Sequence, residues 1–362
     1  MTVRVSAIIS THAAEPFIEG CLQDLIEQSL FTKGLLEIVV VDSASPQDEG
    51  RVVERFQQRY PRIHYHRTIE RETLYGAWNT GIARSSGEYI TNANTDDRHR
   101  ADGLERLLEV IEQHPKVDLV YADVMRSKIA NERFDRNDAS AVFYYKNFFA
   151  PEVLLHYQFG CQPMWRRSVH DRIGPFDANY WAAGDYEFNF RFAMAGLTAL
   201  HVDTPLGSFL ERKEALSTQD HRSVDEQATL RKRYCTTANA VHLYGCAGWD
   251  VTSSTGKVHA LNDLACRSAG FSLPWHPGES FIDAGIAVEC LLEALKLSSH
   301  NTGLLNNLAV ILARLGRAGD ALNLFSQITN IPIGGTVEEN IQIISGKATH
   351  AGKAPQLLRE LA

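Results

Sequence analysis

Several features that define common protein classes are absent from this chain of 362 residues. No apolar run is long enough to cross a bilayer as a helix, which takes about 20 residues. The segment after Met1 has neither the basic start nor the cleavage site of a signal peptide. The six cysteines show no CxxC pair and no zinc-ligand spacing, so we expect buried free thiols. These features predict a cytoplasmic protein and leave peripheral association with the inner face of a membrane open.

Positive charge is also scarce, because 36 Lys and Arg stand against 44 Asp and Glu, a net charge of -8. We therefore expect no nucleic-acid partner, although a local basic patch for phosphates is compatible with this balance. The glycine-rich phosphate loops are missing too. No GxGxxG follows the first predicted strand and GxxxxGK[ST] occurs nowhere, which argues against a Rossmann dehydrogenase and a P-loop NTPase.

What the sequence does contain is an alternation of strand and helix patterns in its first third. Apolar strand-like runs occupy residues 3–10, 36–42, 63–66, 88–91 and 117–123, and helical spacing occupies 17–30, 49–60, 73–84 and 102–113. Such alternation predicts an α/β fold, a mostly parallel sheet with helices on both faces. Ligands bind outside the carboxyl ends of the strands in sheets of this kind.

Those strand ends are unusually polar. The first strand runs into Thr11, the second into Asp42, and the fourth into Asn94, Asp96 and Asp97. Adjacent carboxylates repel each other unless a cation offsets them, and Mn²⁺ or Mg²⁺ binds carboxylate oxygens together with substrate phosphates. We therefore expect a divalent cation and a diphosphate at this edge. The alternative for each acid taken singly is a helix cap or a turn former.

The order of these segments resembles the family 2 glycosyltransferases. The stretches that carry the resemblance are VSAIISTHAAEPFIEGCL, LEIVVVDSAS, AWNTGIARSSGEYITNANTDD and PMWRRSVHDRIGPFDANYWAAGDYEFNFRFAMAG, and together they cover about residues 3–218. The resemblance implies the GT-A fold and a metal-dependent, inverting, hexosyltransferase-like enzyme of polysaccharide biosynthesis. Its donor would be a nucleotide-diphosphate sugar, a UDP-sugar by default. The acceptor stays open between a glycan, a lipid-linked saccharide and a protein.

The same resemblance assigns roles to single residues. Thr11 and Asp42 would contact the nucleotide, and Asn79 would lie on the helix that flanks it. Asp96 would bind both the cation and the diphosphate, with Asp97 beside it as a second metal ligand.

Asp185, in the segment AAGDYE, matches the catalytic base of the family. A carboxylate is the group that an inverting transfer needs, because the attacking hydroxyl must lose its proton. Two alternatives stay open: Asp185 as the N-cap of a helix over residues 186–195, and Glu187 as the proton acceptor. Tyr180 and Trp181 precede this position and would either line a sugar site or pack in the core.

Several positions depart from the family pattern or remain ambiguous. Asn94 replaces the first acid of the metal motif, and Trp78 stands where an arginine is common, which would replace a polar contact by stacking. His12 either stacks on a base or is a turn histidine with a local hydrogen bond. Arg212 and Lys213 lie where the family often has a basic loop near the diphosphate, or else in a solvated charged loop.

From about residue 224 onward the sequence predicts helices without a convincing strand. DAGIAVECLLEALKLSSHN followed by TGLLNNLAVILARLGRAGDALNLFSQITNI, about residues 280–330, resembles tetratricopeptide repeats. We expect a transferase domain at 1–223 and a helical region at 224–362, with a protein partner or self-association through the repeats.

Two other functional classes remain possible at this stage. One is a nucleotidyltransferase, which would normally have a glycine-rich basic loop after the first strand, whereas AAEPFIEG is neither. The other is a non-catalytic scaffold with a degenerate transferase domain that acts through its helical repeats.

Overall fold

The computed structural model describes residues 2–137, 141–212, 221–269, 271–272, 280–281, 284–329, 331–347 and 353–361. These residues fall into two compact units. The first comprises Met1–Phe148 and Tyr157–Leu230, and the second comprises Phe149–His156 and Arg231–Ala362. The division falls within helix α9 (His221–Tyr234).

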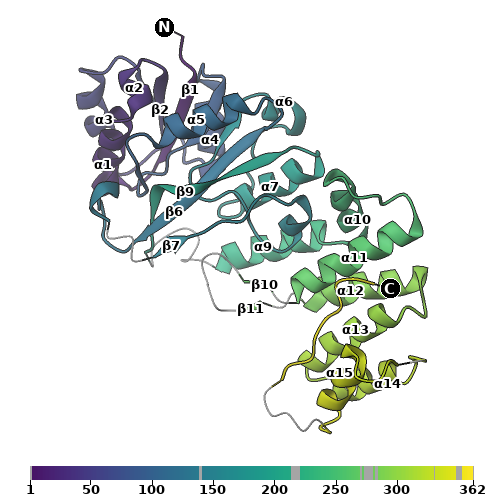
Figure 1. Cartoon of the computed structure of the whole chain (residues 1–362). Coiled ribbons are helices and arrows are strands. Elements are labelled where there is room, and N and C mark those ends of the chain that lie inside the picture. Colours follow the sequence, from purple (N-terminus) through teal and green to yellow (C-terminus); the bar gives the residue numbers. More distant parts are fainter. Residues whose placement is uncertain are drawn as a thin grey trace. The chain divides into compact units, whose positions relative to one another are not determined.

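The first unit is built around a nine-stranded sheet, in which β6 and β9 form the long paired arrows of Figure 1. Its strands are β1 (Val5–Thr11), β2 (Leu36–Asp42), β3 (Ile63–Arg67), β4 (Tyr89–Asn92), β5 (Arg98–His99), β6 (Leu119–Ser127), β7 (Val142–Phe143), β8 (Met164–Arg166) and β9 (Ala199–Leu210). Their order is β3-β2-β1-β4-β8-β6-β9-β5, with β7 paired to β6. The first four strands are parallel, whereas β8 is antiparallel to both β4 and β6. The predicted α/β class is confirmed, with a sheet that is mixed.

Helices cover both faces of this sheet. The helices of the first unit are α1 (Glu15–Ile26), α2 (Ser29–Thr32), α3 (Glu49–Gln57), α4 (Leu74–Ala83), α5 (Gly103–Gln113), α6 (Val169–Ile173) and α7 (Gly184–Met194), with the 3-10 turn η1 (Phe134–Arg136). Alternate residues of β1, among them Val5 and Ile9, join one core with α1 and α5. On the opposite face Ile8 meets Gly81 of α4. A Cβ atom added at Gly81 would lie 2.5 Å from Ile8 Cγ2, so glycine allows this helix to pack close to the sheet.

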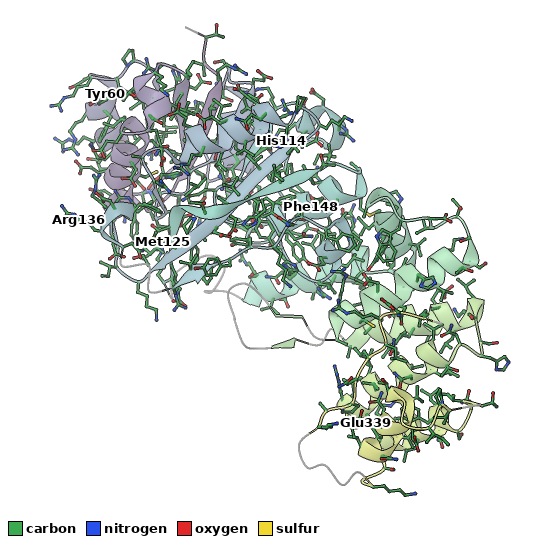
Figure 2. The ribbon with its side chains drawn as sticks, in the orientation of Figure 1. Tyr60, His114, Met125, Arg136, Phe148 and Glu339 are labelled. Carbon is green, nitrogen blue, oxygen red and sulfur yellow. The ribbon has the colours of Figure 1, made fainter. Side chains whose placement is uncertain are left out.

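Aromatic side chains fill the remaining core of this unit. Phe148, labelled in Figure 2, packs with its ring centroid 5.9 Å from Phe192 and 5.7 Å from Phe159. Phe159 and Phe192 are themselves 4.9 Å apart in an edge-to-face pair. Such pairs add about 0.5–1.5 kcal/mol beyond the burial of their area.

The second unit is almost entirely helical, as predicted. Its elements are the 3-10 turn η2 (Ala150–Leu154) and helices α10 (Thr237–Cys246), α11 (Ser254–Ser268), α12 (Ala284–Leu297), α13 (Thr302–Arg314), α14 (Ala318–Phe325) and α15 (Thr336–Ile344). Each helix from α10 onward packs on the next one along the chain. The departure from an all-helical region is a pair of two-residue strands, β10 (Phe271–Ser272) and β11 (Ser280–Phe281). Within the described parts of both units, no helix combines the length and apolar character needed to span a membrane.

Candidate active site

The strand ends that the sequence singled out lie at one edge of the sheet. Strands β1 and β2 run parallel and in register, so that Thr11 stands opposite Asp42. Strand β4 lies on the other side of β1, where Asn92 pairs with Ile8. The chain beyond Asn92 therefore brings Asn94, Asp96 and Asp97 towards the edge that Thr11 and Asp42 occupy.

Asp42 is fully buried and its carboxylate is satisfied inside the protein. Its Oδ1 accepts the Ser45 N–H at 2.8 Å, while its Oδ2 accepts the Tyr65 hydroxyl at 2.6 Å and pairs with Arg67. Burial, followed by the hydrogen bond to Asp42, raises the pKa of Tyr65 to about 12. The Arg67 side chain is 46% exposed and is the outward-facing member of this group. A nucleotide would meet Asp42 by replacing one of these partners, or would meet the network through Arg67.

The Glu49 carboxylate accepts hydrogen bonds from both of the loops that follow β1 and β2. Its Oε1 accepts the Ala14 N–H at 2.7 Å, the Ser45 hydroxyl at 2.8 Å and the Thr11 hydroxyl at 3.4 Å. Its Oε2 is buried without a partner among the described residues. Sequence reasoning missed this role, because an acid at the first residue of a helix is common for electrostatic reasons alone.

His12 and its neighbours make a tight turn after β1. The His12 Nδ1–H donates to the Ser43 carbonyl at 2.8 Å, which is the local hydrogen bond of a turn histidine. Ala13 and Ala44 have φ values of 53° and 46°, a region that non-glycine residues rarely adopt. Strained backbone of this kind clusters at functional sites, where the surrounding hydrogen bonds hold it in place.

Trp78 and Asn79 both contact Phe176, which limits the roles predicted for them. Trp78 is 5% exposed, and its ring packs edge to face on Tyr75 at 5.3 Å and on Phe176 at 5.2 Å, so it lies in the core and does not offer a face to a base. Asn79 donates to the Phe176 carbonyl at 2.8 Å and accepts the Phe176 N–H at 2.9 Å. A nucleotide contact from Asn79 would have to replace one of these two bonds.

Arg212 is bound to Asp96. Its Nε and Nη2 atoms lie 2.9 and 2.7 Å from Asp96 Oδ2, and its guanidinium lies 5.0 Å from the centre of the Phe17 ring. Both of these Arg212 nitrogen atoms therefore contact the Oδ2 atom of Asp96, and neither contacts its Oδ1 atom. Lys213, the other basic residue predicted near the diphosphate, lies outside the described residues.

Asp97 is more deeply buried than Asp96. It is 2% exposed, and its Oδ2 accepts the Asn94 side-chain amide at 3.0 Å. Burial, and then the charge of Asp96, raise the pKa of the Asp97 carboxyl well above its ordinary value.

The chemistry of this strand end fits a divalent cation. Asp96 and the Asn94 amide supply oxygen donors, and Mg²⁺ or Mn²⁺ commonly takes one or two protein carboxylates with substrate phosphates completing the shell. Among the described residues, no three His, Cys, Asp or Glu side chains form a ready-made cage. The fit is therefore to an ion that shares its ligands with a bound substrate.

Asp185 lies in the first turn of α7, as its second residue. The N-cap position belongs to Ala183, which makes no side-chain capping bond, so the capping alternative does not explain Asp185. Its Oδ1 accepts the Tyr75 hydroxyl at 3.1 Å and the Tyr186 N–H at 2.8 Å. Burial raises the pKa of Asp185 above its ordinary value, and these two hydrogen bonds act in the opposite direction. A Cβ added at Gly184 would lie 2.5 Å from the Tyr75 ring, so glycine allows this approach.

Glu187, the other candidate base, forms an ion pair with Arg191. Its two carboxylate oxygens each lie 2.8 Å from Arg191 Nε, one turn further along α7, and the side chain is almost fully buried.

Glu226 holds the loop in front of Asp185. Its carboxylate accepts three consecutive backbone N–H groups, those of Trp181 and Ala182 at 2.9 Å and that of Ala183 at 3.0 Å. Its negative charge adds to burial in raising the pKa of Asp185. Sequence reasoning missed Glu226, because it lies 43 residues beyond Ala183 in a mostly polar helix.

Two arginine guanidinium groups lie over the ring of Trp181, which belongs to the same loop. Arg71 lies 5.2 Å and Arg222 lies 5.5 Å from the ring centre. The indole is thus a cation–π partner, and its predicted contact with a sugar stays a prediction.

Cys161 belongs to the segment that links the end of β4 to the start of α7. Burial raises the pKa of its thiol well above the ordinary value, and the charges of Asp97, Asp185 and Asp96 add to this effect. The backbone carbonyl of Cys161 also accepts the Asn92 side-chain amide at 3.1 Å. The Tyr157 ring lies 6.4 Å from the ring of Tyr186, the residue after Asp185. Residues 157–161 therefore contact both the end of β4 and the start of α7.

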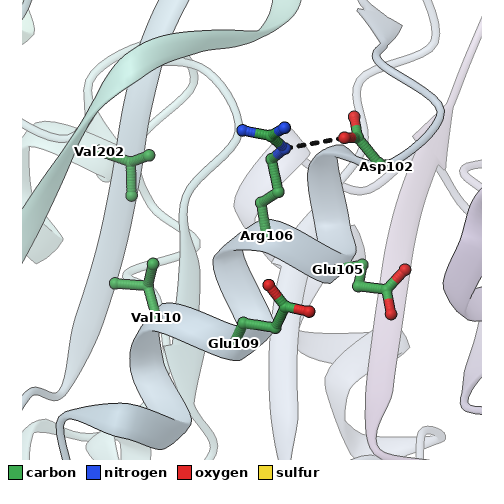
Figure 3. A pocket seen from close by; sticks show the side chains of 6 residues that line it. All are labelled: Asp102, Glu105, Arg106, Glu109, Val110 and Val202. Carbon is green, nitrogen blue, oxygen red and sulfur yellow. Dashed lines mark hydrogen bonds and ion pairs between the residues drawn. The ribbon is translucent and has the colours of Figure 1, made fainter.

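A hollow of about 360 Å³ lies elsewhere on the first unit (Figure 3). It is lined by Asp102, Glu105, Arg106, Glu109, Val110 and Val202. The Arg106 guanidinium pairs with Asp102 at 2.8 Å within it. None of the predicted site residues lines this hollow, so we do not assign it to the reaction.

Comparison with known proteins finds similar glycosyltransferases. Residues 6–174 match the family described as Glycosyl transferase family 2. The chain is 27% identical over 213 residues to the PGL/p-HBAD biosynthesis glycosyltransferase of Mycobacterium bovis (strain BCG / Pasteur 1173P2), covering 57% of this chain and 76% of that protein. It is 26% identical over 254 residues to the uncharacterized glycosyltransferase EpsJ of Bacillus subtilis (strain 168), covering 67% and 71%. These matches support a family 2 glycosyltransferase domain and a glycosyltransferase activity.

Solved structures give the fold. The TM-score is 0.55 against S. aureus TarS 1–349 in complex with UDP-GlcNAc, at 16% identity over 96% of this chain and 93% of that one. It is 0.53 against another crystal structure of TarS 1–349, at 15% identity and the same coverage. The fold is thus GT-A-like, a mixed sheet with helices followed by a helical C-terminal region.

Proposed function

We propose that this chain is a metal-dependent inverting glycosyltransferase, which moves a sugar from a nucleotide-diphosphate donor to an acceptor hydroxyl. The observation that carries the proposal is that residues 157–161 contact the neighbours of both acidic groups: the Cys161 carbonyl accepts the Asn92 amide at the end of β4, and the Tyr157 ring lies 6.4 Å from the ring of Tyr186, the residue after Asp185. An inverting transfer needs two such acidic groups, one for the leaving diphosphate and one for the attacking hydroxyl.

Asp185 is the proposed general base. It takes the proton of the acceptor hydroxyl while that oxygen attacks the anomeric carbon from the face opposite the leaving group. Burial raises its pKa towards the working pH, which strengthens it as a base, and the Tyr75 hydroxyl orients the carboxylate. Glu187 is less suited, because Arg191 holds both of its oxygens.

Asp96 and Asp97 are the proposed ligands of a divalent cation, with the Asn94 amide oxygen as a further donor. Asp97 is buried and accepts the Asn94 amide, so it would have to release that bond to reach the ion. The cation, when bound, supplies positive charge that offsets the charge growing on the departing diphosphate. Arg212 adds a fixed positive charge beside Asp96, and a guanidinium there can donate two hydrogen bonds to phosphate oxygens.

The nucleotide would lie over the ends of β1 and β2, beside Thr11, Asp42 and Arg67. The proposed donor is a sugar linked to uridine diphosphate. The binding of UDP-GlcNAc by the TarS fragment supports testing uridine nucleotides first. The acceptor remains open between a glycan, a lipid-linked saccharide and a protein.

The helical region is proposed to mediate protein contacts. Asn306 and Asn340, on α13 and α15, are 34 positions apart and bonded to each other, a spacing that equals the tetratricopeptide period and supports the predicted repeats. The domain boundary near residue 223 is likewise a proposal.

Calorimetric titration of UDP, GDP, TDP and CMP, each with and without Mn²⁺, tests this function. One nucleoside diphosphate should bind wild type tightly with Mn²⁺ and at least tenfold more weakly without it. Asp96→Ala should lose that difference. Asp185→Asn should bind like wild type, because it removes only the base, and should release nucleoside diphosphate about 10²–10⁴-fold more slowly.

A matched control is Asp102→Ala, which removes an acid from the separate hollow on α5 and should leave all four titrations unchanged. Binding that is equal with and without Mn²⁺ would contradict the metal site and leave Arg212 as the cation. Absence of binding under every condition would contradict the transferase and favour the scaffold alternative.

A further inference from the structure

Two buried polar side chains of the first unit have atoms without a hydrogen-bond partner among the described residues. Both ring nitrogens of His99, on β5, are unpartnered, and so is the Oδ2 atom of Asp123, on β6. His99 is 5% exposed and Asp123 is fully buried. A buried polar group without a hydrogen bond is costly, and native proteins leave few of them, so these atoms call for a partner.

The Asp123 carboxylate is satisfied on one side only. Its Oδ1 atom accepts the Tyr145 N–H at 2.8 Å and lies 2.7 Å from His201 Nε2. The pairing of β6 with β9 shifts register on both sides of Asp123. Such irregularities re-aim a side chain. The shift explains why Asp123 and the adjacent Val124 can line one cavity, although neighbours in a regular strand face opposite sides.

His99 lines the same cavity, which exists because a glycine lies between β5 and β6. His99 pairs with Gly207 of β9, and Gly207 pairs with Val124 of β6. Residues paired across strands face the same side, so the missing side chain of Gly207 leaves a gap in this row. The Gln162 amide occupies part of the gap, since a Cβ added at Gly207 would lie 1.8 Å from Gln162 Oε1. The other walls are apolar residues of α5, β6 and β9.

The size of this cavity fits one water molecule. Its volume is about 10 Å³, and about 10–15 Å³ holds one water. A larger ligand is excluded by this volume. A metal centre is not indicated either, because no three His, Cys, Asp or Glu side chains of the described residues are grouped to hold an ion.

Water also has the donors and acceptors that these atoms require. Burial lowers the pKa of His99 to about 4, so the ring is neutral near pH 7 and has one N–H donor and one acceptor. A water can accept that N–H and donate its own hydrogens to Asp123 Oδ2 and Gln162 Oε1. Three bonds are usual for a buried water. Gln162 is held in place by its own bond to the Arg98 carbonyl, at 3.2 Å.

We propose that His99, Asp123 and Gln162 bind one ordered water, which joins β5 to β6. By holding β5, this water positions the two acids that precede the strand, Asp96 and Asp97. The strand needs such an anchor, because it has two residues and stands at the end of the sheet. Since these acids are the proposed cation ligands, the positioning role rests on the proposed function, whereas the water itself does not.

A crystal structure of the wild-type full chain, at a resolution that shows ordered water, tests the site. We expect a density peak within hydrogen-bond distance of one His99 ring nitrogen and of Asp123 Oδ2, about 2.7–3.2 Å from each. Absence of the peak, or a direct bond between His99 and Asp123, would overturn the proposal.

Substitution of His99 tests the positioning role by calorimetric titration of UDP with and without Mn²⁺. His99→Leu removes the N–H and should weaken the Mn²⁺-dependent binding about tenfold, as the loss of groups that orient metal ligands commonly does. His99→Gln retains an N–H donor and should bind like wild type. Binding without Mn²⁺ should be equal in all three proteins, because a general loss of structure would lower both. The matched control is His114→Leu, since His114 is exposed and bonds only the Val110 carbonyl among the described residues.

A second variant keeps the test decisive if His99→Leu does not fold. Gln162→Leu removes another partner of the water and should weaken Mn²⁺-dependent binding in the same way, with far-UV circular dichroism as the check on folding. Wild-type binding of UDP with Mn²⁺ and unchanged binding by the folded leucine variants would overturn the positioning role and leave the transferase intact. If wild type shows no Mn²⁺-dependent binding, the proposed cation site fails and the positioning role fails with it, while the density still decides the water.

Discussion

The proton affinity of Asp185 depends on groups from three separate segments of the chain. Burial in the first unit raises its pKa, the Tyr75 hydroxyl of α4 lowers it through a hydrogen bond, and the Glu226 charge of α9 raises it. The proposed general base can act only when it is deprotonated, so we expect the reaction rate to fall as the pH falls through the pKa of Asp185. Changes at the two neighbours should therefore move the acid limb of the pH–rate profile in opposite directions.

Tyr75→Phe removes the hydroxyl that favours the charged carboxylate. The pKa of Asp185 should rise, and the acid limb should move to higher pH. Glu226→Gln removes a negative charge that disfavours the carboxylate, so the pKa should fall and the limb should move to lower pH. The measurement is the release of nucleoside diphosphate from the donor across pH, for both variants and wild type.

The rate at the high-pH plateau separates a change in the pKa of Asp185 from a structural change in the loop. Glu226→Gln also weakens the bonds to the N–H groups of Trp181, Ala182 and Ala183, so its rate at the high-pH plateau should fall as well. A loosened loop alone would lower the plateau without moving the limb. Acid limbs that stay fixed, or that move in the same direction in both variants, would remove Asp185 as the base.

Single residues show what sequence patterns can identify. Asp96 and Asp185 were predicted from recognisable segments, and Asp185 lies in the first turn of α7. Their roles stay predictions. Glu49, Glu226 and Tyr75 could not be assigned, because their roles come from partners at other positions in the chain. No local pattern reveals that one carboxylate will collect three N–H groups from a loop 43 residues away.

At the scale of elements, the strands and helices that have clear start or stop signals in the sequence were predicted well. The strand at residues 36–42 is β2, and the helix predicted at 73–84 is α4, preceded by Thr73 as an N-cap whose hydroxyl accepts the Gly76 N–H at 3.1 Å. The position of β8 between β4 and β6 was not predictable. Its three residues are too few to show a period, and strand order depends on packing between distant segments.

Helix α1 is anchored to β5 by a buried ion pair. Asp24 accepts two bonds from Arg98 at 2.6 Å, and both side chains are at most 6% exposed. Asp24→Asn would leave the guanidinium charge buried without its partner, which costs about 3–5 kcal/mol of the free energy of unfolding. The midpoint of urea unfolding, followed by far-UV circular dichroism, measures this loss.

Another acid on the same helix provides the control. Glu19 lies 3.6 Å from Arg55, and their side chains are 65% and 60% exposed. Glu19→Gln should cost about 1 kcal/mol or less, since solvent screens such pairs. Equal losses in the two variants would mean that burial does not strengthen the Asp24–Arg98 pair.

At the scale of the whole molecule, two cores share one chain. The first unit packs helices on both faces of a sheet, and the second packs successive helices on one another. Chains with more than one such core commonly unfold in more than one transition. We therefore expect two transitions in a calorimetric scan, each of which reports on one unit.

Ligands should move these transitions separately. At 100 times its dissociation constant a nucleoside diphosphate with Mn²⁺ stabilises the unit that binds it by about 2.7 kcal/mol, which raises the midpoint of a unit of this size by about 5–10 °C. The proposed site lies within the first unit, so only its transition should move, and Asp96→Ala should abolish the shift. Leu358→Pro should instead lower the transition of the helical unit, because Asn307 on α13 loses the Leu358 N–H that it accepts at 2.7 Å. If nucleotide and the proline variant moved the same transition, the two units would be unfolding together, and the nucleotide site could not be assigned to one unit by its stability.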